Sequence, residues 1–533
     1  CGGGCRCPTL RALAVRAMEA QMQVLESYLS GQWQRGNGPP AAIHDATTGA
    51  VIANASSAGL DLGAALAHCR DVGGPALRAM TFAQRGEILT ALSKAIRADR
   101  DALLDVATAN MGATRGDGKF DLDGASGTLA FYAALGTQLG DRRFLIDGEE
   151  IRLSRSARWV GQHIAVPRRG VAIHINAFNF PAWNMAEKLA TAILAGMPVL
   201  SKPATATSPL AVEVAKRWVD CGALPAGAFA LLTGSVGDLL DHAVAQDCVV
   251  FTGSGATGAK VRGHANVLRH NIPVNVEADS LNAAVIGPDL GPGDAAWDMA
   301  VTEIVRELGQ KAGQKCTAIR RILVPVDRED DLRAAFLDRV TTMVVGDPTA
   351  HETTVGALST AQQKRDFDAG VQAMADAGVA LAWQHEGSVP SEGFFVAPRL
   401  FRSADGVDAP YVHDHEIFGP AATLLPYDGT VQSAAAIVAR GGGSLVTSVF
   451  SDDSDWAGAL LLEIAPYCGR VYWGSEKVAD AGTGHGSVLP GTVHGGPGKA
   501  GGGEELGGER GLGFYMQRTA LQGDAALLRR LLG

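Results

Sequence analysis

The stretch QDCVVFTGSGATG, residues 246–258, allows two interpretations of the chain. It places a glycine-rich turn, G-x-G-x-x-G, directly after an apolar strand-like run, an arrangement that binds the pyrophosphate of a dinucleotide at a helix N-terminus. An acid, Glu277, follows about twenty residues later, where a standard dinucleotide fold has the carboxylate that binds the ribose. In the second interpretation Glu277 takes part in the chemistry. The two interpretations predict different enzymes.

Strand-like and helix-like segments alternate around this stretch. Helices are predicted over 183–195 and 209–220. The predicted strands lie in VAIHIN (171–176), PVLSK (198–202), FALLTG (229–234), DCVVFTG (247–253) and VNVEA (274–278). Repeated β-α-β order with apolar strands predicts the α/β class, a parallel sheet covered by helices on both faces. A second α/β segment is predicted from about 284 to 470, with LVPV (323–326) and SVF (448–450) as strands.

Three further segments carry distinct patterns. Apolar residues recur at helical spacing from Phe82 to Asn110, which predicts amphipathic helices. Residues 149–169 alternate without a helical period, which favours a projecting strand pair over a surface loop. The run 489–513 is rich in glycine and reads as a linker or as ordered turns. Ordered turns are favoured because an extended stretch, FYMQRTALQ, follows and only about twenty residues remain.

Composition narrows the function. A chain of 533 residues predicts two to four modules, and its net charge of -10 argues against a nucleic-acid partner. The longest apolar run, 190–200, is too short to cross a membrane, so no membrane association is expected. Eight scattered cysteines indicate reduced thiols and a cytoplasmic protein. The opening CGGGCRC lacks paired metal-ligand spacing, so no metal is predicted, and residues 1–21 are expected to be a disordered extension.

Six motifs stand in one order along the chain. They are AFNFPAWN (177–184), SKPATATSP (201–209), FTGSGATG (251–258), Glu277, GQKCT (313–317) and HEIFGP (415–420). This series resembles the aldehyde dehydrogenase superfamily over residues 25–525. The resemblance implies a Rossmann-like nucleotide domain, an α/β catalytic domain and a small β oligomerisation hairpin. It also implies the second interpretation, with Gly253, Ser254 and Gly258 at the helix start facing the pyrophosphate and Glu277 as the general base.

The resemblance assigns the chemical step to Cys316 and Asn179. Cys316 corresponds to the nucleophile, whose thiolate attacks an aldehyde to form a thiohemiacetal that can expel hydride. Asn179 corresponds to the oxyanion donor, acting with the backbone N–H of Cys316. Without the motif series, Cys316 would be an inert core residue, Asn179 a turn residue and Glu277 a solvated strand-end acid.

Four other residues correspond to cofactor contacts. Lys202 matches the lysine that reaches the adenosine ribose, and Glu416 the carboxylate that holds the nicotinamide ribose, with Phe418 nearby. The alternative for Lys202 and Glu416 is an ordinary surface charge. The glutamate that NAD-preferring relatives carry three residues after this lysine is Thr205 here, which is neutral and leaves Lys202 free to pair with a 2′-phosphate. NADP is therefore predicted as the preferred cofactor, with NAD possible.

Departures from the family pattern point to a subgroup. The E-L-G-G motif reads EADSLN (277–282), and this variant, GATRGDGKFDLD (112–123) and VHGGPGKAGGGEELGG (493–508) resemble dehydrogenases acting on CoA-linked semialdehydes from aerobic aromatic degradation. The predicted reaction is oxidation of such a semialdehyde to the acid. A CoA-acylating dehydrogenase, a general aldehyde dehydrogenase and a non-catalytic binding protein with this fold remain as alternatives.

The resemblance also implies a division of the chain. Residues 22–148 and 170–283 are expected to form the nucleotide-binding domain and residues 284–512 the catalytic domain. Segments 149–169 and 513–533 are expected to mediate a homodimer or a dimer of dimers.

Overall fold

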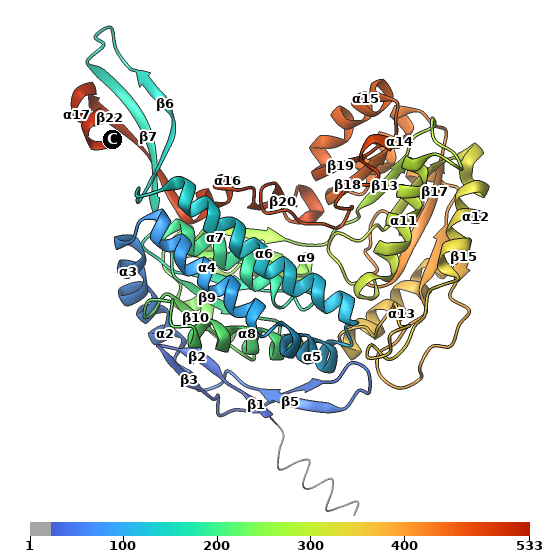
Figure 1. Cartoon of the computed structure of the whole chain (residues 1–533), viewed down its shortest axis with the longest axis horizontal. Coiled ribbons are helices and arrows are strands. Elements are labelled where there is room, and N and C mark those ends of the chain that lie inside the picture. The colour runs from blue at the N-terminus through green and yellow to red at the C-terminus, as the bar shows by residue number, and fades with distance from the viewer. Residues whose placement is uncertain (1–22, 533) are drawn as a thin grey trace, which may run out of the picture.

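The computed structural model describes residues 23–532. It contains two seven-stranded sheets, and each sheet with its flanking helices forms one lobe (Figure 1). A three-stranded arm projects from one side of the first lobe. A small sheet of β1 (Gln23–Leu25), β5 (Val51–Ala55) and β4 (Ala41–His44) lies below the first lobe. The disordered extension predicted for residues 1–21 lies outside the described residues.

The first sheet has the strand order β12-β11-β8-β9-β10-β2-β3. Its parallel strands are β8 (Ala172–Ile175), β9 (Val199–Lys202), β10 (Phe229–Leu231), β11 (Cys248–Thr252) and β12 (Val274–Glu277). The edge strands β2 (Ser27–Leu29) and β3 (Gln32–Gln34) run antiparallel. Helices α7 (Trp183–Ala195) and α8 (Ser208–Asp220) follow β8 and β9. The predicted alternation is confirmed, and the buried strands explain its apolar runs.

Five helices that lie between β5 and β6 (Leu145–Arg152) in the chain cover the first sheet. They are α2 (Leu62–His68), α3 (Gly74–Ala79), α4 (Phe82–Ala98), α5 (Arg100–Met111) and α6 (Arg115–Leu139). Thr81 and Gln84 form a reciprocal cap that starts α4, and Gly112 ends α5 in a left-handed conformation with a φ of 64°. Helices α4, α6 and α7 pack together across the sheet face (Figure 1). The amphipathic helices predicted between Phe82 and Asn110 are confirmed.

The second sheet has the order β15-β16-β17-β14-β13-β18-β19. Its strands are β13 (Ala283–Ile286), β14 (Arg321–Pro325), β15 (Ala380–Gln384), β16 (Arg399–Arg402), β17 (Ala421–Tyr427), β18 (Ser444–Phe450) and β19 (Cys468–Gly474). All neighbours pair in parallel except β15, which is an antiparallel edge. Helices α11 (Ala295–Gly309), α12 (Glu329–Val340), α13 (Ala361–Asp376), α14 (Val431–Arg440) and α15 (Ser454–Ile464) flank it. The second α/β segment is therefore confirmed.

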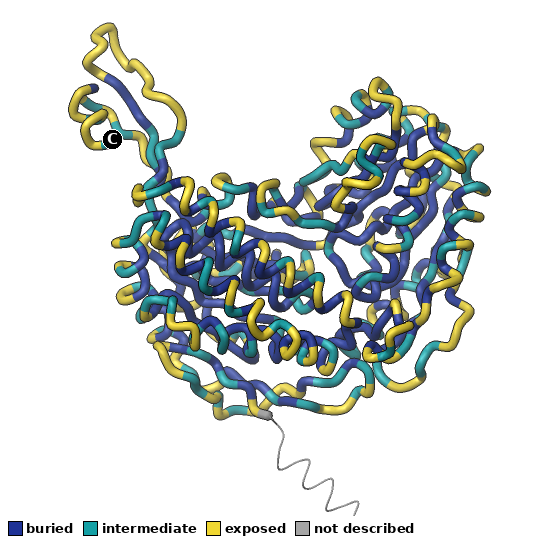
Figure 2. The backbone as a smooth tube through the Cα atoms, in the orientation of Figure 1, coloured by how far each residue is buried: buried dark blue, intermediate teal, exposed yellow. Residues whose placement is uncertain are grey.

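The arm is a strand pair joined by the end of the chain. Strands β6 (Leu145–Arg152) and β7 (Trp159–Pro167) form the pair, and β22 (Met516–Asp524) runs antiparallel to β7. In Figure 2 most of the arm is exposed or half-buried, whereas the interior of each lobe is buried. The pair begins before the expected boundary at residue 149. A short helix, α17 (Ala525–Leu532), follows β22 and was not predicted.

The glycine-rich run near the end of the chain is ordered, as predicted. It forms β20 (Val493–Gly496) and β21 (Gly503–Leu506), which pair with each other, and then α16 (Glu509–Leu512). β21 packs against β12 of the first sheet, and β20 packs against β18 and β19 of the second. Gly501 has a φ of +105°, and a Cβ there would lie 2.2 Å from the carbonyl oxygen of Val276, so this close approach requires glycine. The hairpin thus joins the two lobes.

Candidate active site

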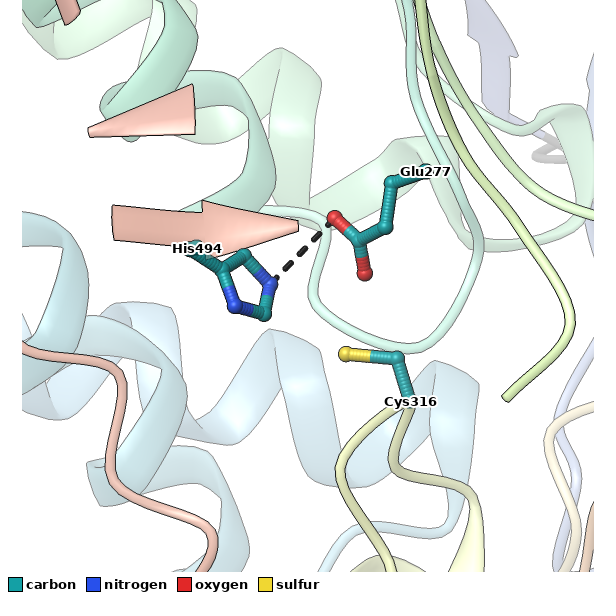
Figure 3. A group of neighbouring side chains, drawn as sticks. All are labelled: Glu277, Cys316 and His494. Atoms are coloured by element: carbon teal, nitrogen blue, oxygen red, sulfur yellow. Dashed lines mark ion pairs between the residues drawn. The ribbon is translucent and has the colours of Figure 1, made fainter. Parts of the chain in front are cut away.

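Three side chains from distant parts of the sequence meet at the junction of the lobes (Figure 3). Glu277 ends β12, Cys316 follows the turn 310–313, and His494 lies in β20. The thiol of Cys316, a carboxylate oxygen of Glu277 and a ring nitrogen of His494 all lie within 4.8 Å of one another. His494 Nε2 is 3.3 Å from Glu277 Oε2. The alternative of a solvated Glu277 is wrong, because only 2% of this residue is exposed.

Burial and charge fix the ionisation of Glu277 and His494. Burial acts to raise the pKa of Glu277, but His494 and then Lys188 outweigh it, so the pKa is lowered. Burial acts to lower the pKa of His494, but Glu277 outweighs it and raises the pKa. The two groups therefore stabilise each other as a carboxylate and an imidazolium.

The thiol of Cys316 is in the opposite situation. Burial first, and then the carboxylate of Glu277, raise its pKa well above the usual value, and the acids Glu187 and Glu416 act in the same direction. These effects favour the thiol form of Cys316. Removing the negative charge of Glu277 will lower the pKa of Cys316, so its thiolate will form more readily.

Asn179 lines the same pocket as Cys316 and Glu277. It is buried in the loop after β8, and its Nδ2 donates to the carbonyl oxygen of Gln314 at 3.0 Å. An amide nitrogen carries two hydrogens, so a second one remains for the pocket. The pocket is lined by the following residues: Phe120, Asn179, Phe180, Trp183, Asn184, Glu187, Thr252, Glu277, Cys316, Thr317, Gly486, Val488 and His494.

The backbone around Cys316 is held by two side chains that directly precede the neighbouring strands β13 and β14. Asn282 Nδ2 donates to the carbonyl oxygens of Cys316 at 2.8 Å and Ala318 at 2.9 Å. Arg320 Nη2 donates to the carbonyl oxygen of Gly313 at 2.9 Å. Asn282 is the last residue of the EADSLN segment, so this segment contacts the loop that contains Cys316.

The strands of the first sheet end in register beside this pocket. Ile175 pairs with Lys202, and Thr252 pairs with Glu277, so the carboxyl ends of β8, β9, β11 and β12 share one edge. Such an edge is where ligands bind in open α/β sheets. Lys202 Nζ donates to the carbonyl oxygen of Pro203 at 3.0 Å and lies 3.5 Å from Thr205 Oγ1. Burial lowers the pKa of Lys202 to about 8. It is 9% exposed, so the alternative of an ordinary surface charge is wrong.

The glycine-rich turn starts α9 (Gly255–Arg262) at the same edge. The Ser254 side chain caps the helix by accepting from the N–H of Thr257. A Cβ at Gly258 would lie 2.9 Å from Val276, so glycine lets α9 approach β12. The N–H of Gly253 donates to the Glu277 carbonyl, and the N–H of Gly255 donates to Asp279 Oδ1 at 3.0 Å. A carboxylate of this chain therefore already occupies one amide at the helix start.

Glu416 and Phe418 face this edge from the second lobe. Glu416 accepts from Arg320 Nε at 3.1 Å and from the N–H of Ser280 at 3.0 Å. Burial raises its pKa to about 7 against the influence of Arg320. The Phe418 ring makes an edge contact with Phe178, with ring centres 5.7 Å apart. Glu416 is therefore held by two donors, and the surface-charge alternative is wrong here as well.

The predicted residues gather in two adjoining groups. Cys316, Glu277 and Asn179 line one pocket, and Lys202, Thr205, Gly253, Ser254, Gly258, Glu416 and Phe418 lie along the strand ends and the facing lobe. Sequence reasoning missed His494, Glu187, Asn282 and Arg320. The signal for His494 was a histidine inside VHGG, within the glycine-rich run that had already been noted.

Comparison with known proteins agrees with this geometry. The family model described as "Aldehyde dehydrogenase family" matches residues 33–521, and the chain belongs to this family. A 3,4-dehydroadipyl-CoA semialdehyde dehydrogenase from Aromatoleum evansii is 43% identical over 478 residues, which is 89% of this chain and 93% of that protein.

Solved structures share the fold. Betaine aldehyde dehydrogenase from Staphylococcus aureus in complex with NAD⁺ superposes with a TM-score of 0.80 at 22% identity, covering 96% of this chain and 97% of that one. An NAD-dependent aldehyde dehydrogenase from Sinorhizobium meliloti gives 0.81 at 22% identity, covering 98% and 97%. Within residues 23–532, no helix is long and apolar enough to cross a membrane.

Proposed function

We propose that this aldehyde dehydrogenase oxidises a CoA-linked semialdehyde to the carboxylic acid, with NADP as the preferred cofactor. The observation that carries the proposal is the pocket in which the Cys316 thiol, the ionised Glu277 and the Asn179 amide converge. The similarity to the 3,4-dehydroadipyl-CoA semialdehyde dehydrogenase supports the substrate class.

In the first stage the Cys316 thiol releases its proton to water, and the resulting thiolate attacks. Its sulfur forms a bond to the aldehyde carbon, and the carbonyl oxygen becomes an oxyanion that the Asn179 amide and the Cys316 N–H stabilise. A nicotinamide cofactor supplies the hydride acceptor at this stage. Loss of hydride from the carbon leaves an acyl thioester on Cys316.

In the second stage water resolves the thioester. Glu277 takes a proton from a water molecule, the resulting hydroxide attacks the acyl carbon, and the Cys316 thiolate leaves. His494 keeps Glu277 ionised, which a base for this step requires. A CoA-acylating enzyme would use a thiol in place of water and would have no need for this carboxylate.

The residues at the strand edge fit a nicotinamide dinucleotide phosphate. Lys202 Nζ has three hydrogens and contacts only the Pro203 carbonyl and Thr205 among the described residues, so it retains a donor for a 2′-phosphate. The hydroxyl of Thr205 donates to the Gly234 carbonyl at 2.8 Å and leaves its neutral side chain beside Lys202. Because residue 205 is a threonine, it places no negative charge beside a bound 2′-phosphate.

A substrate and cofactor panel tests the proposal. Formation of reduced cofactor at 340 nm is measured with free and CoA-linked semialdehydes of equal chain length, each with NADP and with NAD. The highest kcat/KM is expected for a CoA-linked semialdehyde with NADP, and the product is the free carboxylic acid rather than a second CoA thioester. Activity confined to free aldehydes would refute the substrate class. A second CoA thioester would favour the acylating enzyme, and absence of reduced cofactor with every aldehyde in the panel would favour a binding protein.

A further inference from the structure

One turn of helix α6 carries two buried carboxylates outside the active-site pocket. Asp117 and Asp121 are 4% and 1% exposed, and both belong to the GATRGDGKFDLD segment. Residues four apart lie on the same face of a helix, so the two side chains point in one direction. That direction is toward the two loops that contain Asn179 and Cys316.

Asp117 binds the nucleophile loop. Its Oδ1 accepts from the backbone N–H of Lys311 at 2.9 Å, and its Oδ2 accepts from the hydroxyl of Thr114 at 2.8 Å. Lys311 and Ala312 have φ values of 53° and 50°, a left-handed conformation that non-glycine residues seldom adopt. The contact from Asp117 therefore holds the loop in an unusual shape directly before Cys316.

Asp121 binds the loop of the oxyanion donor. Its Oδ1 accepts from the N–H of Trp183 at 2.7 Å, and its Oδ2 lies 3.4 Å from the N–H of Ala182. Ala182 is the N-cap of α7 and has no capping side chain of its own, so Asp121 replaces one from a different helix. Asn179 lies three residues before this cap.

Lys311 completes the cluster between the two acids. Its ammonium lies 4.1 Å from the centre of the Phe180 ring, and Nζ is buried without a hydrogen-bond partner among the described residues. Its charge acts on both Asp117 and Asp121, against the burial that raises their pKa values. A buried lysine without a direct partner fits a role in charge balance for the two carboxylates.

We propose that Asp117 and Asp121 are positioning residues that set the spacing between the two halves of the oxyanion hole. The Asn179 amide and the Cys316 N–H belong to separate lobes, and Asn179 bonds directly to Gln314, so a shift of either loop re-aims the amide. This inference rests on the proposed oxyanion role of Asn179. It goes beyond that role because it assigns a function to two residues of α6 that need not contact the substrate.

The test compares variants of Asp121 with a matched control. Asp121→Ala removes the acceptor and is expected to lower the single-turnover rate of hydride transfer about a hundredfold, as for a misplacement of about 1 Å. The KM for NADP and the rate of Cys316 alkylation by iodoacetamide stay within about twofold, since neither needs the oxyanion hole. Asp121→Asn keeps one acceptor and retains at least about a tenth of the rate. Asp123→Ala, on the same helix but exposed and paired with Arg100, is the control and keeps the wild-type rate.

A double-mutant cycle with Asn179→Ala separates positioning from general weakening. If Asp121 acts through Asn179, the double variant is no slower than Asn179→Ala alone by more than about threefold. If the rate losses of the two single variants instead multiply in the double variant, the inference is overturned, while the proposed function stays intact. If Asn179→Ala alone keeps the wild-type rate, the oxyanion assignment itself fails. Should Asp121→Ala not fold, the same cycle is run with Asp121→Asn, and a multiplicative loss there is equally decisive.

Discussion

At the scale of single residues, the environment of Glu277 favours one of the two interpretations of the glycine-rich turn. Glu277 pairs with Thr252 at the end of adjacent strands, directly beside the turn that starts at Gly253. Its side chain is buried against His494 and Cys316 and does not extend along the strand edge where Lys202 lies. The carboxylate is thus placed beside the Cys316 thiol, as the second interpretation expects, and the proposed function assigns the ribose contacts to other residues.

Asn179→Ala tests the oxyanion donor. Loss of one donor of this kind lowers turnover by roughly a hundred- to a thousandfold, because the charge develops in a site from which water is excluded. We expect kcat to fall in that range while the KM for NADP stays nearly unchanged. Steady-state kinetics over both substrates measure this, and a loss confined to cofactor affinity would contradict the assignment.

Thr205→Glu tests the cofactor selector. A carboxylate there would repel the 2′-phosphate and pair with Lys202, and a partly exposed charge pair of about 1 kcal/mol changes affinity several-fold. The KM for NADP is expected to rise about fivefold or more relative to that for NAD. The parameters for NAD serve as the internal control. Higher wild-type efficiency with NAD would withdraw Lys202 and Thr205 as selectors.

At the scale of elements, the β20–β21 hairpin brings His494 to Glu277. This hairpin packs against β12, and Asn275 in β12 donates to the carbonyl of Glu504 at 3.2 Å. His494 therefore reaches Glu277 from a segment that is far away in the sequence. The ion pair is the main reason that a carboxylate with 2% exposure stays ionised.

His494→Gln tests that account through the pH profile. The pKa of Glu277 is lowered in the wild type, so removal of the imidazolium lets burial raise it. The acid limb of the deacylation rate, where Glu277 becomes protonated, is expected to move to higher pH by about 1–3 units. His351→Gln, a change at an exposed loop residue, is the control. An acid limb at the wild-type pH would show that His494 does not set the ionisation of Glu277.

The regular elements were predictable because their patterns are local. The apolar runs of β8, β9, β11 and β12 and the helical spacing of α4, α5 and α7 depend only on neighbours in sequence. The motif residues Cys316, Glu277 and Asn179 were also found. His494 and Asp121 were not, because their roles depend on contacts across the lobes and between helices. Helix α17 was missed because it spans only eight residues, although its leucines recur at helical spacing.

At the scale of the whole molecule, the arm carries apolar surface that its own fold leaves exposed. Its large exposed apolar residues are Ile151, Leu153, Trp159, Leu527 and Leu531. Grouped apolar surface of this kind marks protein contacts, and a second copy of the chain fits the predicted dimer.

Charges on the arm test this assembly. The pair Leu527→Glu and Leu531→Glu, 67% and 66% exposed, is expected to shift the mass in light scattering toward the monomer. Leu462→Glu is the control, since Leu462 is 80% exposed on α15, far from the arm. An unchanged mass for the double variant would place the interface elsewhere.

The two lobes and the hairpin between them bring the Cys316 thiol, the Glu277 carboxylate and the Asn179 amide together, and we propose that Cys316 and Glu277 act in successive stages. Glu277→Gln separates the stages in a single-turnover experiment. Because Glu277 raises the pKa of Cys316, the variant should form its thiolate more readily and still release reduced cofactor in a first turnover. Intact-protein mass spectrometry should then find the acyl thioester on Cys316, while Cys316→Ala gives neither signal. Wild-type steady-state turnover by Glu277→Gln, with no accumulated acyl enzyme, would contradict the account.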